Sequence, residues 1–407
     1  MNRRNAEWRR SSPRVDLVGA LTALTLCLGT LDASTANSYA SGPSDPFGPA
    51  TTNSEQASLN ATYSSAVLVA YRGVSSHAPW YWQVSEAAVK REIAEAAALG
   101  VNLIRIPVEW SELESSKEGV RGGVALARLD LIVNEAAARG IKVDGTIATT
   151  PHWASPGGAW NDAPLDPEKS LRGFIKWLTE RYGTKLVAVG VLNEPNKLEN
   201  LRSPTGEVLS RKTEEGIKRR AYYYVKDVKA IFRGAREGNA AVKVLVGETG
   251  IREGESKSRL FLKSCFEGGL PHAGEKAQTG FKGFYDGFSG HVFAEGAAPE
   301  STKRSSTKSK IEQIHTFLEE REGSNPVPVW ASEWGYSIED SETVRAEYVE
   351  KGVEMLDTQF PYLNGWAYYQ LRDTMDAPAK KEQNFGLLHY SFEPRPSFAA
   401  FKAGMTA

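Results

Sequence analysis

Short apolar runs alternate with longer segments of helical spacing along the chain, from about residue 62 to its end. The runs are rich in Val, Ile, Leu and Gly, and most of their positions are apolar. They cover residues 67–74, 101–108, 141–148, 186–192, 242–247, 283–293, 327–332 and 364–370. Strands that are apolar along nearly their whole length are typical of a parallel sheet that is buried on both faces.

The segments between these runs place apolar residues three or four positions apart, which predicts amphipathic helices. They cover residues 85–99, 124–139, 167–182, 213–236, 256–266, 309–322, 343–358 and 394–403. Eight strands that alternate with eight helices predict an α/β fold, a closed (β/α)8 TIM barrel, in preference to an open doubly wound sheet. In such barrels the active site lies at the carboxyl ends of the strands, so the catalytic residues are expected at those positions.

The N-terminal residues 1–40 have the pattern of a secretion signal peptide. Five arginines lie within residues 3–14, an apolar run covers residues 17–31, and Ser38-Tyr39-Ala40 offers a small-x-small cleavage site. The alternative is a membrane anchor, but fifteen apolar residues are fewer than the ~20 that a spanning helix needs. The pattern therefore predicts a secreted or extracytoplasmic protein with no stable membrane insertion after the signal is cleaved.

Composition and charge add limits of their own. The chain of 407 residues is 41% hydrophobic and 24% charged, as in ordinary globular proteins. Residues 41–61, rich in Ser, Pro, Gly, Thr and Asn, are predicted to be a disordered linker, and residues 62–407 to be one catalytic domain. A formal net charge of −1 argues against nucleic acid as a partner. Nothing in the sequence fixes the oligomeric state.

Two glutamates stand at predicted strand ends. Glu194 follows the fourth apolar run, in Asn193-Glu194-Pro195, and Glu333 follows the seventh, in Ser332-Glu333-Trp334. A carboxylate beside an apolar run is costly to bury unless another group pairs with it. Since all strands of the barrel end on one face, we expect the two side chains to meet there, and paired carboxylates are the groups that cleave glycosidic bonds.

These motifs, together with Arg105-Ile106-Pro107, resemble those of the clan-A glycoside hydrolases, a superfamily of (β/α)8 retaining glycosidases. Residues 108–114, 385–388 and 394–398 suggest family 5 cellulase-like or family 39-like members of the clan. The resemblance implies that Glu194 is the general acid/base and Glu333 the nucleophile, with carboxylates ~5–5.5 Å apart. It also implies that Asn193 binds the sugar 2-hydroxyl and that Arg105 holds Glu333 ionised.

Further residues near strand ends are candidates for contact with a carbohydrate. Trp366, on the eighth run, is expected to form the floor under the reacting sugar, as the clan usually has a tryptophan there. Core packing is the alternative for each aromatic residue. The remaining candidates for substrate binding are Trp334, Trp110, Trp153, His152 and His291.

One position departs from the clan pattern. Where many members have His-x-Tyr on the sixth strand, this chain has His291-Val292-Phe293, and phenylalanine carries no hydroxyl. Tyr336 is a candidate substitute for the missing contact to the nucleophile. Four more carboxylates near strand ends are interpreted as substrate-contacting or rim residues, with solvated loop positions as the stronger alternative: Glu109, Glu248, Asp286 and Asp373. The basic segment 302–310 is interpreted as a solvated loop that enters a helix, with contact to an acidic glycan as the alternative.

Other classes of site find little support. The six histidines are scattered without a His-Glu-x-x-His motif, and no glycine-rich nucleotide loop is present, so no metal and no cofactor is expected. The function predicted is therefore hydrolysis of O-glycosidic bonds in a poly- or oligosaccharide. A carbohydrate-binding barrel with impaired catalysis and a transglycosylase stay open as alternatives, as does the identity of the sugar.

Overall fold

The strands close into a single parallel barrel. The structure, a computed structural model, describes residues 69–80, 84–197, 199–249, 256–294, 296–337, 341–375 and 384–406. Each strand pairs in parallel with its neighbours in the sequence, and β1 also pairs with β8. The strands are β1 (Tyr71–Ser75), β2 (Leu103–Glu109), β3 (Lys142–Ala148), β4 (Leu186–Val191), β5 (Lys243–Thr249), β6 (Gly287–His291), β7 (Val329–Trp334) and β8 (Leu363–Tyr368). The predicted (β/α)8 barrel is confirmed.

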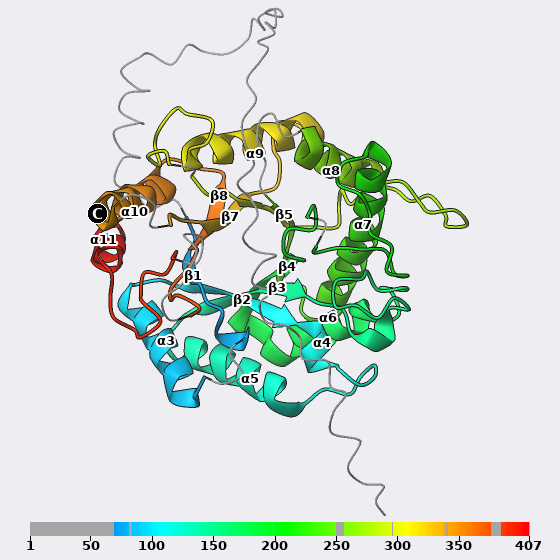
Figure 1. Cartoon of the computed structure of the whole chain (residues 1–407), viewed down its shortest axis with the longest axis horizontal. Helices are drawn as coiled ribbons and strands as arrows, with labels where there is room; N and C mark the ends of the chain where they lie inside the picture. Colours follow the sequence, from blue (N-terminus) through cyan, green and yellow to red (C-terminus); the bar gives the residue numbers. More distant parts are fainter. Residues whose placement is uncertain are drawn as a thin grey trace, which may run out of the picture. The chain divides into compact units, whose positions relative to one another are not determined.

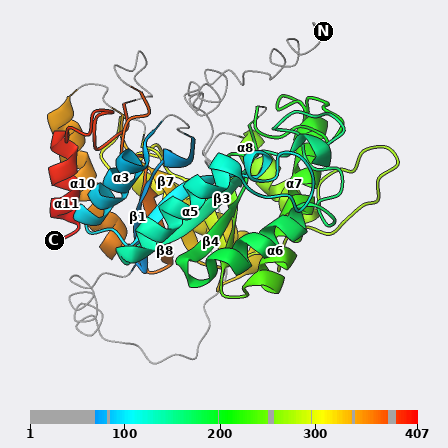
Figure 2. The same cartoon turned by 90° about the horizontal axis from the view of Figure 1, so that it is seen from below.

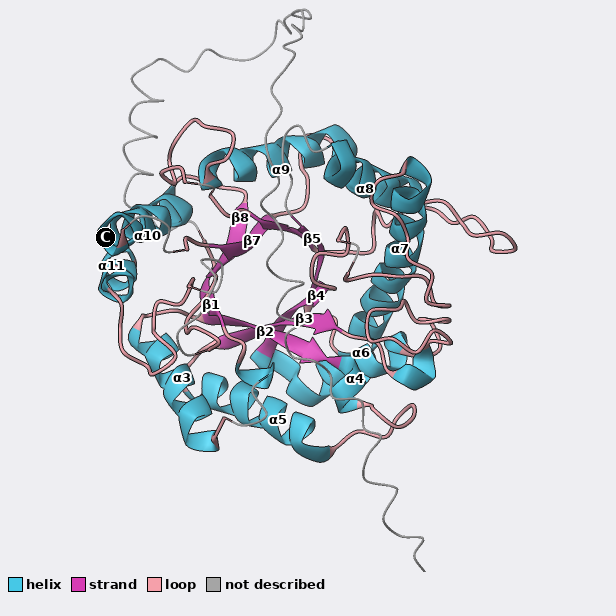
Figure 3. Ribbon diagram, viewed as in Figure 1, coloured by secondary structure: helices cyan, strands magenta, loops and turns pink. Residues whose placement is uncertain are grey.

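The helices form an outer ring around this barrel (Figures 1 and 3). They are α3 (Glu86–Ala98), the short α4 (Trp110–Leu113), α5 (Gly123–Ala138), α6 (Leu171–Tyr182), α7 (Glu214–Gly238), α8 (Ser256–Glu267), α9 (Thr307–Glu322), α10 (Glu342–Thr358) and α11 (Pro396–Gly404). Figure 2 shows the barrel from the side, with α10 and α11 on one flank and α6 and α7 on the other. Among the described residues, no helix has the length and apolarity needed to cross a bilayer.

The structure differs from the sequence prediction mainly at three element starts. The run predicted from residue 67 becomes strand β1 only at Tyr71, after the non-strand residues 69 and 70. The sixth run, predicted from residue 283, becomes a strand only at Gly287, because Gly283 lies in a turn with a φ of +85°. The helix predicted from Pro167 begins at Leu171, since residues 166–170 form a turn in which the Ser170 amide donates to the Asp166 carbonyl. The predicted signal peptide and linker lie outside the described residues.

The apolar core has an outer and an inner part. The larger part lies between the strands and the surrounding helices. A second cluster joins Leu103, Ala188, Leu245 and Trp330, which come from four different strands, and Trp330 stacks on Tyr71 with ring centroids 5.2 Å apart. Since β2 and β7 are not neighbours, this cluster fills the barrel interior near the amino-terminal parts of the strands. The polar side chains described below occupy the opposite, carboxyl-terminal end.

Candidate active site

Five charged or titratable side chains meet at the carboxyl-terminal end of the barrel. They come from β2, the residues just after β4, and from β5, β6 and β7, and each is at most 5% exposed: Arg105, Glu194, Glu248, His291 and Glu333. The sequence predicted four of them as site residues. It interpreted the fifth, Glu248, as a substrate-contacting or rim residue or a solvated loop position, and that interpretation is wrong, because Glu248 is fully buried at the centre of the group.

Arg105 links three residues of this group. Its Nη1 lies 2.6 Å from Oε1 of Glu333, and its Nη2 lies 2.7 Å from Oε2 of Glu248 and 3.1 Å from Oδ1 of Asn193. Burial by itself would lower the pKa of Arg105, but the carboxylates of Glu248 and Glu333 outweigh burial and raise it. The guanidinium therefore stays charged and fixes the two carboxylates and the amide relative to one another.

His291 contacts three carboxylates at once. Its Nδ1 lies 3.3 Å from Oε1 of Glu194 and 3.4 Å from Oε2 of Glu333, and its Nε2 lies 3.3 Å from Oε2 of Glu248. Because one oxygen of Glu194 and one oxygen of Glu333 both contact Nδ1 of His291, the distance between these two oxygens cannot exceed the sum of the two contact distances. This upper bound admits the ~5–5.5 Å separation of retaining glycosidases and excludes most of the ~6.5–9.5 Å range of inverting ones.

Backbone irregularities aim these side chains. The strand register shifts between Gly247 and Thr249 on β5, between Ser289 and His291 on β6, and between Ala331 and Trp334 on β7. Each shift falls at or beside a residue of the site, as expected of β-bulges, which re-aim side chains. Glu194 and Glu248 also both have a φ of 45°, a left-handed conformation that costs a non-glycine residue of order 1–3 kcal/mol.

Two close approaches hold Glu248 and Glu194 in these conformations. The Glu194 amide donates to the Glu248 carbonyl at 2.9 Å, which joins the ends of β4 and β5. Gly190 lies beside the Glu248 side chain, and a Cβ at Gly190 would be only 2.8 Å from Oε1 of Glu248. A glycine is therefore required on β4 for the buried carboxylate of β5 to fit.

The protonation of the site follows from these contacts. Burial would raise the pKa of Glu194, but the hydrogen bond from His291 and the ammonium of Lys197, which pairs with Oε2 of Glu194, lower it to about 2. Burial would lower the pKa of His291, but the charge of Glu333 and the hydrogen bonds to Glu194 and Glu248 raise it to about 9. These contacts favour the ionised form of Glu194 and the protonated form of His291 in the resting site.

Two predicted tryptophans do not face the site. Trp366 is fully buried, its Nε1 donates to Oδ1 of Asp357 on α10 at 2.9 Å, and its ring packs on Phe401 of α11. Trp334 is also fully buried and packs edge-on against Trp366. Both point from the barrel toward the helices, so the prediction that Trp366 forms the floor of a sugar subsite is wrong, as is the placement of Trp334 at a subsite.

The other predicted binding residues have contacts away from the five-residue group. Trp110 is buried with its Nε1 on Oε2 of Glu114, and half-buried Trp153 donates to the Glu114 carbonyl at 2.6 Å. Exposed His152 places its Nδ1 3.0 Å from the carbonyl oxygen of Gly158.

Tyr336 does not replace the hydroxyl that Phe293 lacks. The Tyr336 hydroxyl donates to the Ala297 carbonyl at 3.1 Å, so the expectation that Tyr336 substitutes at Glu333 is wrong. Phe293 packs edge-on against Tyr369, which follows β8, with ring centroids 5.6 Å apart. Glu333 is held instead by Arg105 and His291.

Two of the remaining carboxylates have structural contacts. Asp286 precedes β6 at the opposite end of the barrel, where it pairs with Arg236 and accepts the Val244 amide at 2.8 Å. Asp373 is buried and pairs with Arg395 at 2.7 Å, which ties down the segment before α11. Neither is the substrate-contacting residue that the sequence allowed. Glu109 is half-buried at the end of β2.

The sequence also contains a signal that Glu248 belongs to the site. Glu248 directly follows the fifth apolar run, so the strand-end rule that selected Glu194 and Glu333 applies equally to it. Lys197, three residues after Glu194, gave no signal of its own, because a single lysine after a strand is usually solvated. Among the residues that the structure describes, no group of three or more His, Cys, Asp or Glu side chains is arranged to hold a metal ion.

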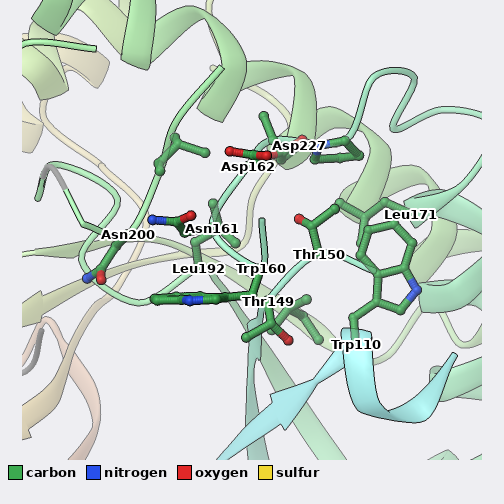
Figure 4. Close-up of a pocket in the computed structure, with 14 residues that line it drawn as sticks. Trp110, Thr149, Thr150, Trp160, Asn161, Asp162, Leu171, Leu192, Asn200 and Asp227 are labelled. Atoms are coloured by element: carbon green, nitrogen blue, oxygen red, sulfur yellow. The ribbon is translucent and has the colours of Figure 1, made fainter. Parts of the chain in front are cut away.

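A cavity lies between helix α7 and the loops that follow β3 and β4. Figure 4 shows Trp110, Trp160, Thr150 and Asn200 among its lining residues. Asp227 of α7 also lines the cavity; it is 1% exposed, and neither carboxyl oxygen has a hydrogen-bond partner among the described residues. Burial raises the pKa of Asp227 well above its ordinary value, so we expect this carboxyl to be protonated in the folded protein.

Replacing Asp227 by asparagine is expected to stabilise the protein, and by more as pH rises. The unfolded chain releases this proton near pH 4, whereas the folded protein keeps it, so raising the pH favours the unfolded state of the wild type. The stability gain of Asp227→Asn should grow by at most about 1.4 kcal/mol per pH unit, up to the pKa of the folded carboxyl. Urea unfolding of both proteins at pH 5, 6.5 and 8 measures this gain.

Asp130 provides a control of opposite sign. Burial would raise its pKa, but hydrogen bonds from Arg181 and Tyr182 lower it, so its ionised form stabilises the folded state above the ordinary aspartate pKa. Asp130→Asn should therefore destabilise the protein at pH 8 and lose that effect toward acid pH. A stability difference between Asp227→Asn and wild type that is independent of pH would contradict the protonated state of Asp227.

Comparison with known proteins agrees with this barrel. The family described as cellulase (glycosyl hydrolase family 5) matches residues 59–247, somewhat less than half of the chain. The matched range includes Arg105, Asn193 and Glu194 and ends before Glu248 and Glu333. No curated protein matches the sequence.

Solved glycoside hydrolases share the fold. A family 39 glycoside hydrolase from Bacteroides cellulosilyticus WH2 has a TM-score of 0.62 and 18% identity, over 84% of this chain and 65% of that one. The GH39 enzyme from Xanthomonas axonopodis pv. citri has a TM-score of 0.59 and 16% identity, over 84% and 67% of the two chains. The GH5_18 protein from Streptomyces cattleya, in complex with GlcNAc, has 0.57 and 17%, over 84% and 80%.

The chain thus spans about two-thirds of the length of the two family 39 structures, and at these identities the likeness concerns the fold. The activity is indicated by the cellulase family match, which covers the first of the two strand-end glutamates. The chain thus has the barrel fold of solved glycoside hydrolases and, over residues 59–247, is similar to the cellulases of glycosyl hydrolase family 5.

Proposed function

We propose that the protein is an exported retaining glycosidase that cleaves O-glycosidic bonds of a poly- or oligosaccharide by double displacement. The observation that carries the proposal is the shared contact of Glu194 and Glu333 with Nδ1 of His291, at 3.3 and 3.4 Å. This contact sets two carboxylates from opposite walls of the barrel close enough for one to attack the anomeric carbon while the other protonates the leaving oxygen.

The first step forms a glycosyl-enzyme on Glu333. Its carboxylate, held by Arg105 at 2.6 Å, attacks the anomeric carbon as the bond to the leaving oxygen breaks, and Glu194 gives that oxygen a proton. In the second step Glu194 removes a proton from water, which attacks the anomeric carbon and releases Glu333. Asn193, with Oδ1 on Arg105, keeps its amide hydrogens for the sugar 2-hydroxyl.

The substrate class we propose is a β-linked neutral glycan. Two of the structures that share the fold are described as an exo-β-1,4-mannosidase from an Opitutaceae bacterium and a family 1 β-glucosidase from Thermotoga maritima. The near-neutral charge of the chain gives no reason to expect an acidic polymer. Digestion of a panel of β-glucans, β-mannans and xylans, followed by chromatography of the products, tests both the activity and the choice among these sugars.

Mass-spectrometric trapping tests the mechanism directly. A 2-deoxy-2-fluoro glycosyl fluoride of each sugar should label wild type on the peptide that contains Glu333, and Glu333→Gln should take no label. A protein that binds glycans but takes no label and releases no product is the impaired binding barrel, and its detection would overturn the proposal. Formation of products longer than the substrate, with little release of free sugar, would identify a transglycosylase that uses the same intermediate.

Export forms part of the proposal and has its own test. Expression of the full chain in a bacterial host with N-terminal sequencing of the exported protein should give a mature start at Ser41, directly after Ser38-Tyr39-Ala40. An uncleaved chain that stays with the membrane fraction would favour the anchor instead.

A further inference from the structure

Glu248 and His291 form a buried pair beside Glu194, the proposed general acid. Glu248 is fully buried, and its Oε2 lies 3.3 Å from Nε2 of His291, whose Nδ1 lies 3.3 Å from Oε1 of Glu194. Both ring nitrogens thus face carboxylate oxygens. A neutral imidazole has one N–H and can donate on one side alone, so the two contacts are satisfied together only when the group holds an additional proton, on the ring or on a carboxyl.

This arrangement bears on a difficulty in the proposed mechanism. A general acid must be protonated when the leaving oxygen departs, but the surroundings of Glu194 lower its pKa to about 2. The contacts with His291 and Lys197 favour the ionised form of Glu194, which cannot donate a proton. The proton is present in the site nevertheless, because the same contacts raise the pKa of the neighbouring His291 to about 9.

We propose that His291, held by Glu248, stores the catalytic proton in the resting enzyme and passes it to Glu194 during turnover. Glu248 is a positioning residue in this arrangement, since it acts through His291. The inference rests on the proposed function, because it assigns the source of the proton that Glu194 delivers.

The transfer balances over one catalytic cycle. The Nδ1–H bond of His291 breaks, its electron pair stays on Nδ1, and an O–H bond forms on Oε1 of Glu194, which hands the proton to the leaving oxygen. His291 is then neutral and keeps its Nε2–H as a donor to Glu248. When water attacks the glycosyl-enzyme, Glu194 takes a proton from it and returns this proton to Nδ1, which restores the resting state.

The other charged groups around the pair are consistent with this role. Glu333 also faces Nδ1 of His291 at 3.4 Å, while Lys197 pairs with Oε2 of Glu194, the oxygen that does not face the imidazole. Oε2 of Glu248 accepts from Arg105 at 2.7 Å and from the Ser332 hydroxyl at 3.3 Å. Asp144 on β3 interacts electrostatically with Arg105 and Glu248; its pKa is raised to about 7 by burial and by Glu248.

Histidine NMR tests the proton store without any substrate. The chain has six histidines, so labelling with [13Cε1]histidine gives six signals, and the His291 signal is the one lost in His291→Gln. In wild type it should keep the shift of an imidazolium to above pH 8. In Glu248→Gln, which removes the charge facing Nε2, its midpoint should fall by at least one pH unit, and Glu248→Asp, which keeps the charge, should restore most of that shift.

Leaving-group dependence tests the transfer itself. On the aryl β-glycoside that wild type accepts, Glu248→Gln should lose at least about tenfold more kcat/KM with a phenyl leaving group than with 2,4-dinitrophenyl, because the latter leaves with little help from an acid. The alkaline limb of its pH profile should also move to lower pH, since the His291 proton is then lost earlier. Asp286→Asn, a change of carboxylate to amide at the opposite end of the barrel, should show neither effect.

The outcomes separate this inference from the proposed function. A His291 signal that is neutral at pH 7 in wild type, or that titrates alike in folded wild type and Glu248→Gln, would overturn the proton store even if the protein cleaves glycans. Equal losses on both aryl glycosides would overturn the transfer to Glu194. A wild type that cleaves no glycoside would refute the proposed function, and the NMR titration would still decide the protonation of His291.

Discussion

Glu333→Gln is expected to lower kcat/KM by on the order of 10⁴-fold or more on every substrate, because no glycosyl-enzyme can form without the carboxylate that attacks. The loss should be independent of the leaving group. Steady-state rates on a matched pair of phenyl and 2,4-dinitrophenyl glycosides measure it. Since the amide oxygen of the variant side chain can still accept from Arg105 in place of Oε1, the fold should be retained, and a thermal melt close to that of wild type confirms this.

The corresponding change at Glu194 has a different signature. Glu194→Gln should lower kcat/KM by about 10²–10⁴-fold on the phenyl glycoside and by much less on the dinitrophenyl glycoside. Azide then distinguishes the two roles: Glu194→Ala should yield the glycosyl azide with retained configuration, and Glu333→Gly the azide with inverted configuration. The reverse assignment of anomers would exchange the roles of the two glutamates, and an unchanged rate in either variant would refute the catalytic pair.

Arg105→Met is expected to have the second-largest effect, on both stability and activity. The guanidinium is the counter-charge of two buried carboxylates, Glu248 and Glu333, and removal of one partner from a buried ion pair costs about 3–5 kcal/mol. The loss of kcat should exceed the loss explained by unfolding, because Glu333 and Asn193 lose their common anchor. Urea unfolding and kcat/KM at a temperature where the variant is folded measure the two effects separately.

Arg372→Met is the matched control for this variant. Arg372 pairs with buried Glu92 of α3 at 2.8 Å, so its removal also leaves a buried carboxylate without that ion pair, but outside the site described above. We expect a similar loss of stability with kcat close to that of wild type. If Arg105→Met kept kcat within a few-fold of wild type while its stability fell, the arginine would be a structural residue and not an anchor of the catalytic pair.

The barrel and the meeting of Glu194 and Glu333 could be predicted because they follow from rules that act along the chain. Apolar runs of six to eleven residues that alternate with helical segments favour a parallel sheet, which buries both faces of each strand. Parallel strands then bring their carboxyl ends to one side, which places Glu194 and Glu333 together without any knowledge of loops. Arg105 and His291 could be selected in the same way.

The prediction that Trp334 and Trp366 contact the substrate is wrong because both faces of these strands are buried. When both faces of a strand are buried, alternation of apolar and polar residues no longer tells which side chains face the barrel interior. Trp330 lies in the interior cluster, whereas Trp334 and Trp366 face α10 and α11. The distinction is set by the register of β7, which shifts between Ala331 and Trp334 and lets Glu333 reach Arg105 while Trp334 points outward.

The sequence by itself determined the fold class, the eight strands and helices to within a few residues, and the strand-end glutamates, because hydrophobic periodicity and strand direction are local properties. Only the tertiary structure decided that Glu248 is a buried partner of Arg105 and His291 and not a rim residue. Its position depends on a φ of 45°, on the register shift in β5 and on the absence of a side chain at Gly190. Such contacts join strands that are distant in sequence, and they form only when the closed barrel fixes which atoms approach one another.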